Sequence, residues 1–229
     1  MDDFRRRFLE LAMRAQALRF GDFTLKSGRS SPYFFNAGRF DSGAALAALA
    51  DCYADAIDAA LGADTFDLLF GPAYKGIPLA SALACSYARR GRDLPLAFNR
   101  KEAKTHGEGG SLIGAPLAGR RVLIVDDVIT AGTAIREALA LIREGGGTPA
   151  AIAIALDREE VIDADATRRQ SAAQAVAAEH AIPVIAIASL SDLLAFAGQN
   201  PDLVAERERL VAYRSRYGCQ RQDGRDVHH

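Results

Sequence analysis

The stretch Val122-Leu-Ile-Val-Asp-Asp-Val-Ile-Thr-Ala-Gly-Thr-Ala134 decides how this chain folds. Its first part, Val122–Val125, is a continuous apolar run, which predicts a strand that is buried on both faces of a parallel sheet. Two acids, Asp126 and Asp127, follow directly, and after a few small residues a helical pattern covers Ile135–Ile142. A buried strand, a short turn and a helix in this order are typical of an open α/β sheet, whose ligands bind at the carboxyl ends of the strands.

The residues after this strand have the chemistry of a phosphorylated-sugar site. The small residues 130–133 predict a tight turn whose free N–H groups open a helix, and such a turn is a ready site for an anion. The carboxylates beside it can accept hydrogen bonds from a vicinal diol. We therefore interpret the stretch as a ribose 5-phosphate site, with the hydroxyls on the acids and the phosphate on the turn. Two alternatives stay open at this point: acids that hold Mg²⁺, as in receiver domains, and helix capping without a ligand.

Length and composition favour one globular domain. The chain has 229 residues, of which 49% are hydrophobic and 25% charged, enough for a single α/β domain and scarcely enough for two. We predict one domain over residues 1–217, with a lid at about 99–117 and a polar, frayed tail at 218–229. The net charge of −1 argues against bulk nucleic-acid binding, which needs a basic field.

The cysteines and the N-terminus bear on the compartment. Cys52, Cys85 and Cys219 form neither a CxxC pair nor a metal-binding spacing, and an odd, scattered set fits a reducing cytoplasm. The charged N-terminus lacks the apolar core of a signal peptide. No apolar run approaches the length needed to span a membrane, so we expect a cytoplasmic protein without a membrane partner.

Hydrophobic periodicity predicts strands that alternate with helices, and therefore a mostly parallel sheet with right-handed crossovers. The predicted strands are Phe23–Lys26, Tyr33–Asn36, Phe66–Phe70, Leu94–Phe98, Val122–Val125, Ala150–Leu156 and Ile182–Ala188. The predicted helices are Phe4–Leu18, Ser42–Leu61 (capped by Asp41 or Ser42), Ile77–Arg90, Ile135–Ile142, a short segment near Asp192–Phe196, and Pro201–Tyr217.

Two segments break this alternation. Residues 99–117 show no periodicity and are rich in glycine, and structureless loops of that length inside a domain are often lids. The alternative for this segment is a disordered surface insertion. Residues 159–170 are acidic and then basic, and we expect them to form a solvated connection.

Two clusters of cations can complete the site. Lys75 and Gly76 follow a buried strand, so a cation and a backbone that can approach an anion closely are expected at the same sheet edge. Arg100, Lys101 and Lys104 start the lid segment, together with His106, and can neutralise a diphosphate leaving group. Each cluster, taken alone, is more typical of solvated surface, and only the other motifs beside it favour a role in the site.

The order acid-acid-x-x-Thr-x-Gly-Thr resembles the phosphoribosyl diphosphate (PRPP) signature of type I phosphoribosyltransferases. Four other stretches resemble the orotate phosphoribosyltransferase family within that group, and the resemblance covers nearly the whole chain up to about Tyr217. These stretches are Phe20–Gly28, Ser31–Asn36, Phe70–Ile77 and Asn99–Gly110, of which the Phe-Phe-Asn strand and the lid are the more specific.

The resemblance implies a type I phosphoribosyltransferase fold: an open, mostly parallel α/β sheet flanked by helices, with a small N-terminal hood and a flexible lid. It implies transfer of phosphoribose from PRPP to orotate, giving orotidine 5′-monophosphate and diphosphate in pyrimidine synthesis, with Mg²⁺ held mainly by PRPP. It also implies a homodimer that shares the lid across its interface.

The implied residue roles are as follows. Lys101 and Asp127 are the expected catalytic residues. PRPP is expected at Lys26, Tyr74, Lys75, Arg100, Lys101, Lys104, His106, Asp126, Asp127, Val128, Ile129, Thr130, Ala131, Gly132, Thr133 and Ala134. Orotate is expected at Phe34, Phe35, Thr130 and Arg158, where the fork of the guanidinium matches the carboxylate of the base.

The segment after Arg158 departs from the family pattern. Glu159–Asp165 stands where the family carries a basic, glycine-containing hood segment, so no hood contact is expected from it. Two other functions stay open: a phosphoribosyltransferase for a purine base, and a regulatory PRPP-binding protein without catalysis. The second should carry a DNA-binding segment and a basic face, which this sequence lacks.

Overall fold

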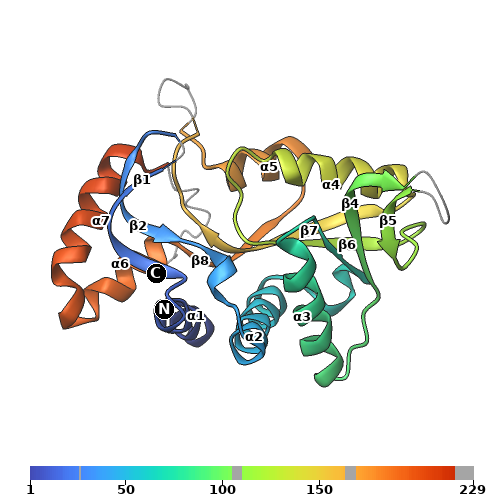
Figure 1. Cartoon of the computed structure of the whole chain (residues 1–229), viewed down its shortest axis with the longest axis horizontal. Helices are drawn as coiled ribbons and strands as arrows, with labels where there is room; N and C mark the ends of the chain where they lie inside the picture. Colours follow the sequence, from blue (N-terminus) through green and yellow to red (C-terminus); the bar gives the residue numbers. More distant parts are fainter. Residues whose placement is uncertain (26, 105–109, 163–168, 220–229) are drawn as a thin grey trace, which may run out of the picture.

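A twisted sheet forms the centre of the structure, a computed structural model that describes residues 1–25, 27–104, 110–162 and 169–219 (Figure 1). Within these residues six strands pair in the order β5-β4-β3-β6-β7-β8, and all neighbours are parallel except β4 and β5. The strands are β3 (Leu68–Gly71), β4 (Leu96–Lys104), β5 (Gly110–Gly114), β6 (Arg121–Asp126), β7 (Thr148–Asp157) and β8 (Val184–Ser189). The predicted mostly parallel α/β sheet is confirmed.

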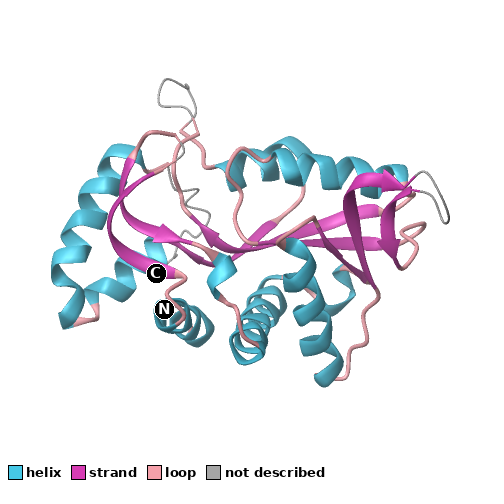
Figure 2. Cartoon of the chain, viewed as in Figure 1, coloured by secondary structure: helices cyan, strands magenta, loops and turns pink. Residues whose placement is uncertain are grey.

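Helices cover both faces of this sheet (Figures 1 and 2). On one face lie α1 (Asp3–Arg14), α2 (Gly43–Ala60) and α3 (Gly76–Arg89), and on the other lie α4 (Thr133–Glu144) and α5 (Ala172–His180). Ser42 begins α2 as its cap, because its hydroxyl accepts a hydrogen bond from the Ala45 amide at 3.2 Å. Short 3₁₀ helices lie at η1 (Ala37–Arg39) and η2 (Ala63–Thr65).

The apolar run Val122–Val125 is buried because its side chains alternate between two cores. Leu123 and Val125 belong to the cluster beneath α1–α3, whereas Val122 and Ile124 belong to the cluster beneath α4 and α5. All four side chains are fully buried. A strand covered by helices on both faces needs apolar side chains at every position, which explains the continuous run.

A second, two-stranded sheet forms the hood. Its strands, β1 (Leu18–Thr24) and β2 (Ser30–Phe35), are antiparallel and pack against α7 (Val204–Tyr217), which follows α6 (Leu190–Gly198) and η3 (Pro201–Leu203). The predicted start of the first strand at Phe23 was late: Leu18 already pairs with Phe35. The predicted helix end at Leu18 was correspondingly wrong, because the chain leaves the helix after Arg14.

Three expectations about the irregular segments need correction. The lid segment, residues 99–117, is not structureless on either side: β4 extends to Lys104 and pairs with β5, so an antiparallel hairpin flanks residues 105–109, which lie outside the described residues. Helix α5 was not predicted, although Ser171 and Gln174 form a capping box at its start. Gly218 and Cys219 were assigned to the frayed tail, yet Gly218 lies opposite Glu160 in an isolated antiparallel bridge, and the Cys219 amide donates to the Glu159 carbonyl at 2.7 Å.

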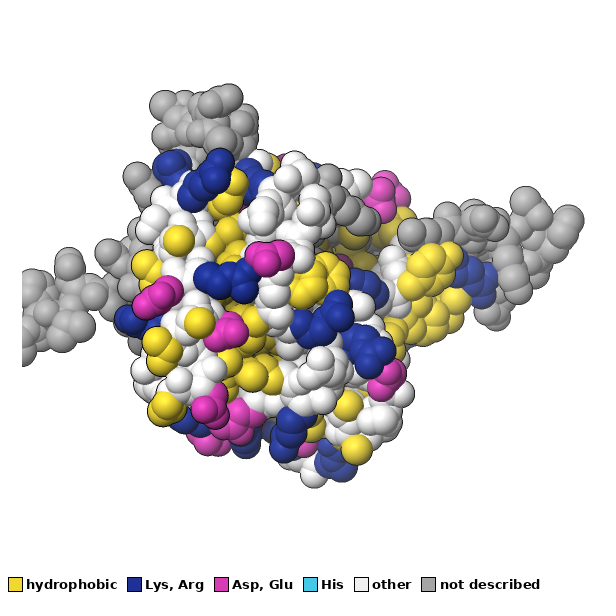
Figure 3. Space-filling view, turned by 60° about the vertical axis from the view of Figure 1, so that its left-hand side comes forward, with side chains coloured by type: hydrophobic (Ala, Val, Ile, Leu, Met, Phe, Trp, Pro, Cys, Tyr) yellow, Lys and Arg dark blue, Asp and Glu magenta, His cyan; other side chains and the backbone are white. Residues whose placement is uncertain are grey.

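Basic and acidic side chains are interspersed over the face shown in Figure 3, without a broad field of one sign. Among the described residues, no helix is both long and apolar enough to cross a membrane.

Candidate active site

The carboxyl ends of three neighbouring strands bring the main predicted residues to one sheet edge. Strands β3, β6 and β7 are adjacent, and they lead respectively into the loop with Lys75, the pair Asp126 and Asp127, and Arg158. Parallel strands necessarily end at the same edge, which is where open α/β sheets bind ligands. Residues that lie far apart in the sequence therefore form one site.

The acid pair is buried and its backbone is held from two sides. Asp126 is only 8% exposed and Asp127 only 6%. Tyr53 donates its hydroxyl to the Asp126 carbonyl at 2.7 Å, and the Ala155 amide of β7 donates to the Asp127 carbonyl at 2.9 Å. The Asp127 amide donates to Oδ1 of Asp126 at 2.9 Å. These bonds fix where the carboxylates stand before any ligand binds.

Lys75 reaches the acid pair from the neighbouring loop. Its Nζ lies 2.6 Å from Oδ2 of Asp127, and its own side chain remains 55% exposed. Gly76 allows this approach, because a Cβ there would lie 2.7 Å from the carbonyl oxygen of Val125 and 2.6 Å from Cδ of Pro72. A cation and two acids thus share one corner of the site, and the side chain of Tyr74 beside them is 67% exposed.

The pKa of Asp126 is raised to about 7. Burial is the first cause, because it disfavours the charged carboxylate, and the negative charge of Asp127 is the second. The cation of Lys75 opposes the shift without cancelling it. Near neutral pH the pair can therefore hold a proton, and Asp126 gains its full charge only above about pH 7.

The turn after the acids is anchored at its start and open at its end. Val128 packs against the core and Ile129 is buried, whereas the four residues Thr130, Ala131, Thr133 and Ala134 are exposed. Gly132 has a φ of 75°, in the left-handed region that suits glycine, and it precedes α4 without capping the helix through a side chain. The first N–H groups of α4 are therefore available to an anion.

Arg136 stiffens this turn from the first turn of α4. Its Nη1 donates to the Ala131 carbonyl at 2.8 Å, and its Nη2 lies 2.9 Å from Oε2 of Glu179 on α5. Arg136 thus joins the turn to a neighbouring helix, and neither the motif nor the spacing had marked it.

Arg158 lies at the end of β7 and faces the hood. Its side chain is 20% exposed, and its Nε donates to Oε1 of Glu160 at 2.9 Å. The guanidinium carbon lies 5.4 Å from the centre of the Tyr33 ring, which is fully buried. Arg158 is therefore not a solvent-exposed arginine at a strand end.

The predicted solvated connection after Arg158 was wrong at its start. Glu160 accepts hydrogen bonds from the hydroxyls of Tyr213 at 2.9 Å and Tyr33 at 3.4 Å, and Arg29 donates to the Val161 carbonyl at 2.9 Å. These residues join the hood, the site and α7, so the expectation that the segment makes no hood contact is also wrong. The rest of the connection, residues 163–168, lies outside the described residues.

The two aromatic residues predicted at orotate occupy opposite faces of β2, because successive strand residues alternate. Phe35 packs with Phe8 and Phe40 against the core. Phe34 lies beside Phe23, with ring centroids 5.5 Å apart. The face of Phe35 is also the face of Tyr33, and hence the one that meets Arg158.

The lid residues are only partly described. Asn99 accepts a hydrogen bond from the Ala73 amide at 2.8 Å, so the start of the lid segment is tied to the loop of Lys75, and Arg100 follows it at intermediate burial. Lys101 and Lys104 belong to β4, but their side chains lie outside the described residues, as do Lys26 and His106 entirely.

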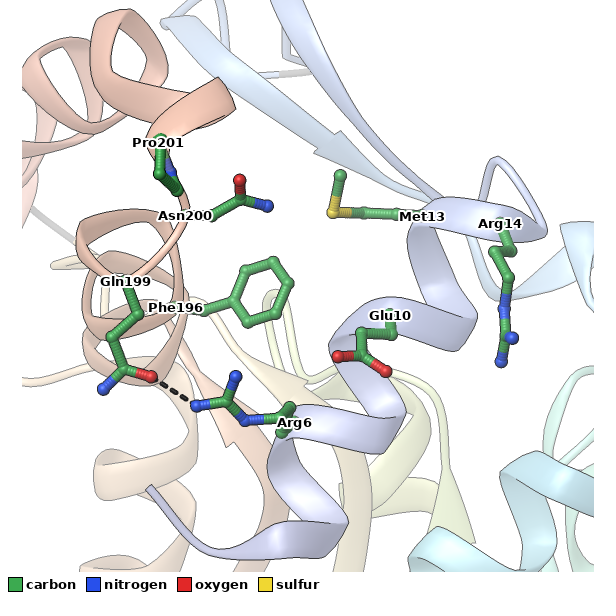
Figure 4. A pocket seen from close by; sticks show the side chains of 8 residues that line it. All are labelled: Arg6, Glu10, Met13, Arg14, Phe196, Gln199, Asn200 and Pro201. Atoms are coloured by element: carbon green, nitrogen blue, oxygen red, sulfur yellow. Dashed lines mark hydrogen bonds between the residues drawn. The ribbon is translucent and has the colours of Figure 1, made fainter.

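A cavity of about 420 Å³ lies elsewhere, between α1 and the end of α6 (Figure 4). Charged and apolar side chains line it, among them Arg6, Glu10, Met13 and Phe196. None of the predicted site residues lines this cavity. The converging strand ends, where the charged groups meet, are therefore the better candidate for the chemistry.

Comparison with known proteins agrees with this geometry. Residues 40–178 match the family model described as "Phosphoribosyl transferase domain". The orotate phosphoribosyltransferase of Xanthomonas axonopodis pv. citri (strain 306) is 76% identical over 218 residues, which cover 95% of this chain and 98% of that protein. The orotate phosphoribosyltransferase of Stenotrophomonas maltophilia (strain K279a) is 69% identical over the same shares. A crystal structure of the orotate phosphoribosyltransferase of Francisella tularensis superimposes with a TM-score of 0.81 at 40% identity, covering 92% of this chain and 98% of that one.

The family model matches more than half of the chain, the relatives match nearly its full length, and the PRPP-type turn lies at the ligand-binding edge of the sheet. The chain therefore belongs to the orotate phosphoribosyltransferase family.

Proposed function

We propose that the edge formed by β3, β6 and β7 carries out the family's transfer of phosphoribose from PRPP to orotate. The observation that carries this proposal is the convergence of Lys75, the acid pair and Arg158 on three adjacent strand ends. The site has one group for each charged or polar part of the two substrates: a cation for the diphosphate, acids for the ribose diol and a guanidinium for the carboxylate of orotate.

PRPP binds along the turn and the acids. The 5-phosphate accepts hydrogen bonds from the N–H groups at the start of α4, and the ribose hydroxyls donate hydrogen bonds to Asp126 and Asp127. Lys75 pairs with Asp127 at 2.6 Å. When PRPP binds, the ammonium group of Lys75 can leave this carboxylate and pair with the diphosphate. Arg100, Lys101, Lys104 and His106 close over the diphosphate from the lid, as the family pattern implies.

Orotate binds between Arg158 and the hood strand β2, with Phe35 on the Arg158 side of that strand and Thr130 near the base. The reaction is a displacement at the anomeric carbon, with a transition state that resembles an oxocarbenium ion. The protein positions the two substrates and neutralises the charge that grows on the leaving diphosphate. A general base is unnecessary if orotate enters already deprotonated at N1.

Mg²⁺ is the proposed cofactor. Among the described residues, no group of three or more His, Cys, Asp or Glu side chains can hold a metal ion. Two acids, one of them paired with Lys75, suit an ion that keeps several waters and takes its other ligands from a diphosphate. When bound, the ion would neutralise charge on the diphosphate, and the protein would hold it through the substrate.

The family pattern also supports a homodimer that shares the lid, and a cytoplasmic location. The three cysteines, Cys52, Cys85 and Cys219, are unpaired thiols, which suits a reducing compartment.

A direct assay tests the function as a whole. Purified protein with PRPP and Mg²⁺ is expected to consume orotate, followed by its absorbance, and to release diphosphate. Turnover of a purine base instead would identify the purine enzyme, and PRPP binding without turnover of any base would identify the regulator. Either result would contradict the proposal.

Asp126 predicts a pH dependence of PRPP binding. The pKa of this carboxyl is about 7 in the folded protein, above its ordinary value of 3.8. Between these two pH values the folded protein therefore binds one proton more than the unfolded chain. The stability that this proton contributes is lost as the pH rises toward 7. Ionisation should strengthen the bond from the ribose, so PRPP affinity is expected to rise through pH 7. Calorimetric titration of wild type and Asp126→Asn between pH 6 and 8.5 measures this effect.

The comparison with Asp126→Asn is needed because phosphate groups of PRPP also titrate near pH 6. The affinity difference between the two proteins should widen above pH 7, and the variant should melt at a higher temperature than wild type at pH 8. A difference that stays constant over the whole range would contradict the assigned role of the Asp126 proton.

Arg158→Ala is expected to raise the KM for orotate by about 10- to 100-fold, while the KM for PRPP changes less than about threefold. The reason is that only the base carries a carboxylate, and a hydrogen bond to a charged group contributes about 1.5–3 kcal/mol. Steady-state kinetics with each substrate varied provides the measurement. Equal rises in both constants would count against the role. Arg158→Lys, which keeps the charge but loses the fork, should fall between the two.

A further inference from the structure

Glu160 is a partly buried acid for which neither the motif nor the family comparison supplied a role. Its side chain is 13% exposed, and its Oε1 is the meeting point of three donors: Nε of Arg158 at 2.9 Å, the Tyr213 hydroxyl at 2.9 Å and the Tyr33 hydroxyl at 3.4 Å. Its Oε2 lies 4.0 Å from Nη1 of Arg29. The three donors come from different parts of the fold: Arg158 directly follows β7, Tyr213 lies on α7 and Tyr33 lies on β2.

The pairing uses one edge of the Arg158 guanidinium and leaves part of it without an acceptor. Nη2 of Arg158 lies 2.7 Å from the same Oε1, but the contact lacks hydrogen-bond alignment, and this nitrogen is a buried donor without a hydrogen-bond partner in the described structure. A buried unsatisfied donor is costly, so it is rarely kept without a function. The Arg158 side chain as a whole is 20% exposed, so part of it remains accessible to a ligand.

The ring of Tyr33 restricts the movement of the Arg158 guanidinium on a second side. It lies 5.4 Å from the guanidinium carbon and is itself fully buried. Because Tyr33 and Tyr213 both donate to Glu160, the acid is held by groups other than Arg158. Glu160 therefore has a fixed position before it fixes that of Arg158.

We propose that Glu160 is a positioning residue, which orients Arg158 so that its remaining donors meet the carboxylate of orotate. The proposal rests on the proposed role of Arg158 in orotate binding. It treats Tyr33 and Tyr213 as the supports of Glu160, so the hood and α7 contribute to base recognition without touching the base. An arginine held in advance loses less side-chain freedom on binding, which favours affinity for orotate over affinity for PRPP.

If Glu160 instead competed with orotate for Arg158, its removal would change the orotate KM in the opposite direction. If Glu160 merely occupied the guanidinium in place of the substrate, its removal would release Arg158 and lower the KM for orotate. The three donors that hold Oε1 argue against such an exchange, because leaving this place would strand two tyrosine hydroxyls as well as the arginine.

The test compares Glu160→Gln with Glu159→Gln. Both substitutions remove one carboxylate from neighbouring positions, but Glu159 accepts from the amide and hydroxyl of Ser191 and makes no bond to Arg158 in the described structure. Glu160→Gln is expected to raise the orotate KM about fivefold, with kcat and the PRPP KM within about twofold of wild type. Glu159→Gln should leave all three constants within about twofold.

A double-mutant cycle separates positioning from a general structural effect. In the Arg158→Ala background, Glu160→Gln should change the orotate KM by less than about twofold, because the residue through which it acts is gone. An undiminished fivefold effect there would overturn the proposal, as would an unchanged or lowered orotate KM for Glu160→Gln alone. If Arg158→Ala itself leaves the orotate KM unchanged, the proposed function of Arg158 fails first, and the two failures are thus distinguishable.

Tyr213→Phe keeps the inference testable if Glu160→Gln does not fold. It removes the 2.9 Å hydrogen bond to the same Oε1 without changing any charge. It is expected to raise the orotate KM about threefold, with the PRPP KM unchanged, and thermal unfolding establishes that the variant is folded. An unaltered orotate KM in the folded variant would overturn the role of the cluster.

Discussion

Asp127→Asn is expected to weaken PRPP binding by about 10- to 100-fold while the protein remains folded. Asp127 is 6% exposed and pairs with Lys75, and we assign its carboxylate to the ribose hydroxyls. Asparagine keeps the volume but loses the charge, and a hydrogen bond to a charged group contributes about 1.5–3 kcal/mol, where 1.4 kcal/mol is a tenfold change in affinity. Calorimetric titration of PRPP into the variant measures the effect.

Asp67→Asn is the matched control. Asp67 stands just before β3, beside the start of β6 and so at the opposite edge of the sheet, where it accepts from the amide of Arg121 at 2.9 Å and pairs with its Nε at 3.0 Å. Removing that charge should leave the PRPP affinity unchanged, even if the protein loses some stability. Wild-type affinity in Asp127→Asn would contradict the diol assignment.

Local sequence was sufficient for the elements that build the PRPP side of the site. Val122–Val125 has to be apolar at each position because helices cover both faces of β6, and this pattern is legible in the sequence. The location of Lys75 at the same sheet edge as Asp127, 52 residues away, also followed, because strands that run parallel end at a common edge, although the ion pair between them was not predicted. Both inferences need only the order of strands and helices.

The orotate side could not be derived in the same way. Glu160 meets Tyr33 across 127 residues and Tyr213 across 53, and these partners lie on the hood and on α7, whose positions no periodicity specifies. A polar stretch such as 159–170 looks the same whether solvent or buried tyrosines satisfy its acids. Sequence reasoning therefore assigned it to solvent, and only the packing of the hood corrects this.

The lid illustrates a different limit. Residues 99–117 show no periodicity in the sequence, although β4 and β5 pair there as an antiparallel hairpin at the edge of the sheet. The family resemblance, rather than periodicity, assigned a function to the cations there. The strongest test of that assignment is kinetic.

Lys101→Ala is expected to lower kcat by about 100-fold or more, because the removal of a single group that stabilises transition-state charge costs about that much. We assign Lys101 to the charge on the departing diphosphate, so the loss should appear in kcat as well as in kcat/KM. Stability is expected to change little, because we place Lys101 on the lid outside the core. Arg120→Ala, which removes an exposed cation from the loop before β6, at the far edge of the sheet, is the control and should retain wild-type kcat.

Mixed dimers can then show which subunit's lid serves which site. Lys101→Ala is combined with Asp127→Asn and assayed at a PRPP concentration near the wild-type KM, where the low kcat of the first variant and the weak PRPP binding of the second leave each homodimer with little activity. If the lid closes over the neighbouring subunit, a heterodimer contains one site with both defects and one with neither, so up to half of wild-type activity per heterodimer should return after subunit exchange. If the lid serves its own subunit, every site carries one defect, and no activity returns although mass spectrometry detects heterodimers. That second outcome would remove the shared-lid proposal and leave the role of Lys101 in its own site intact.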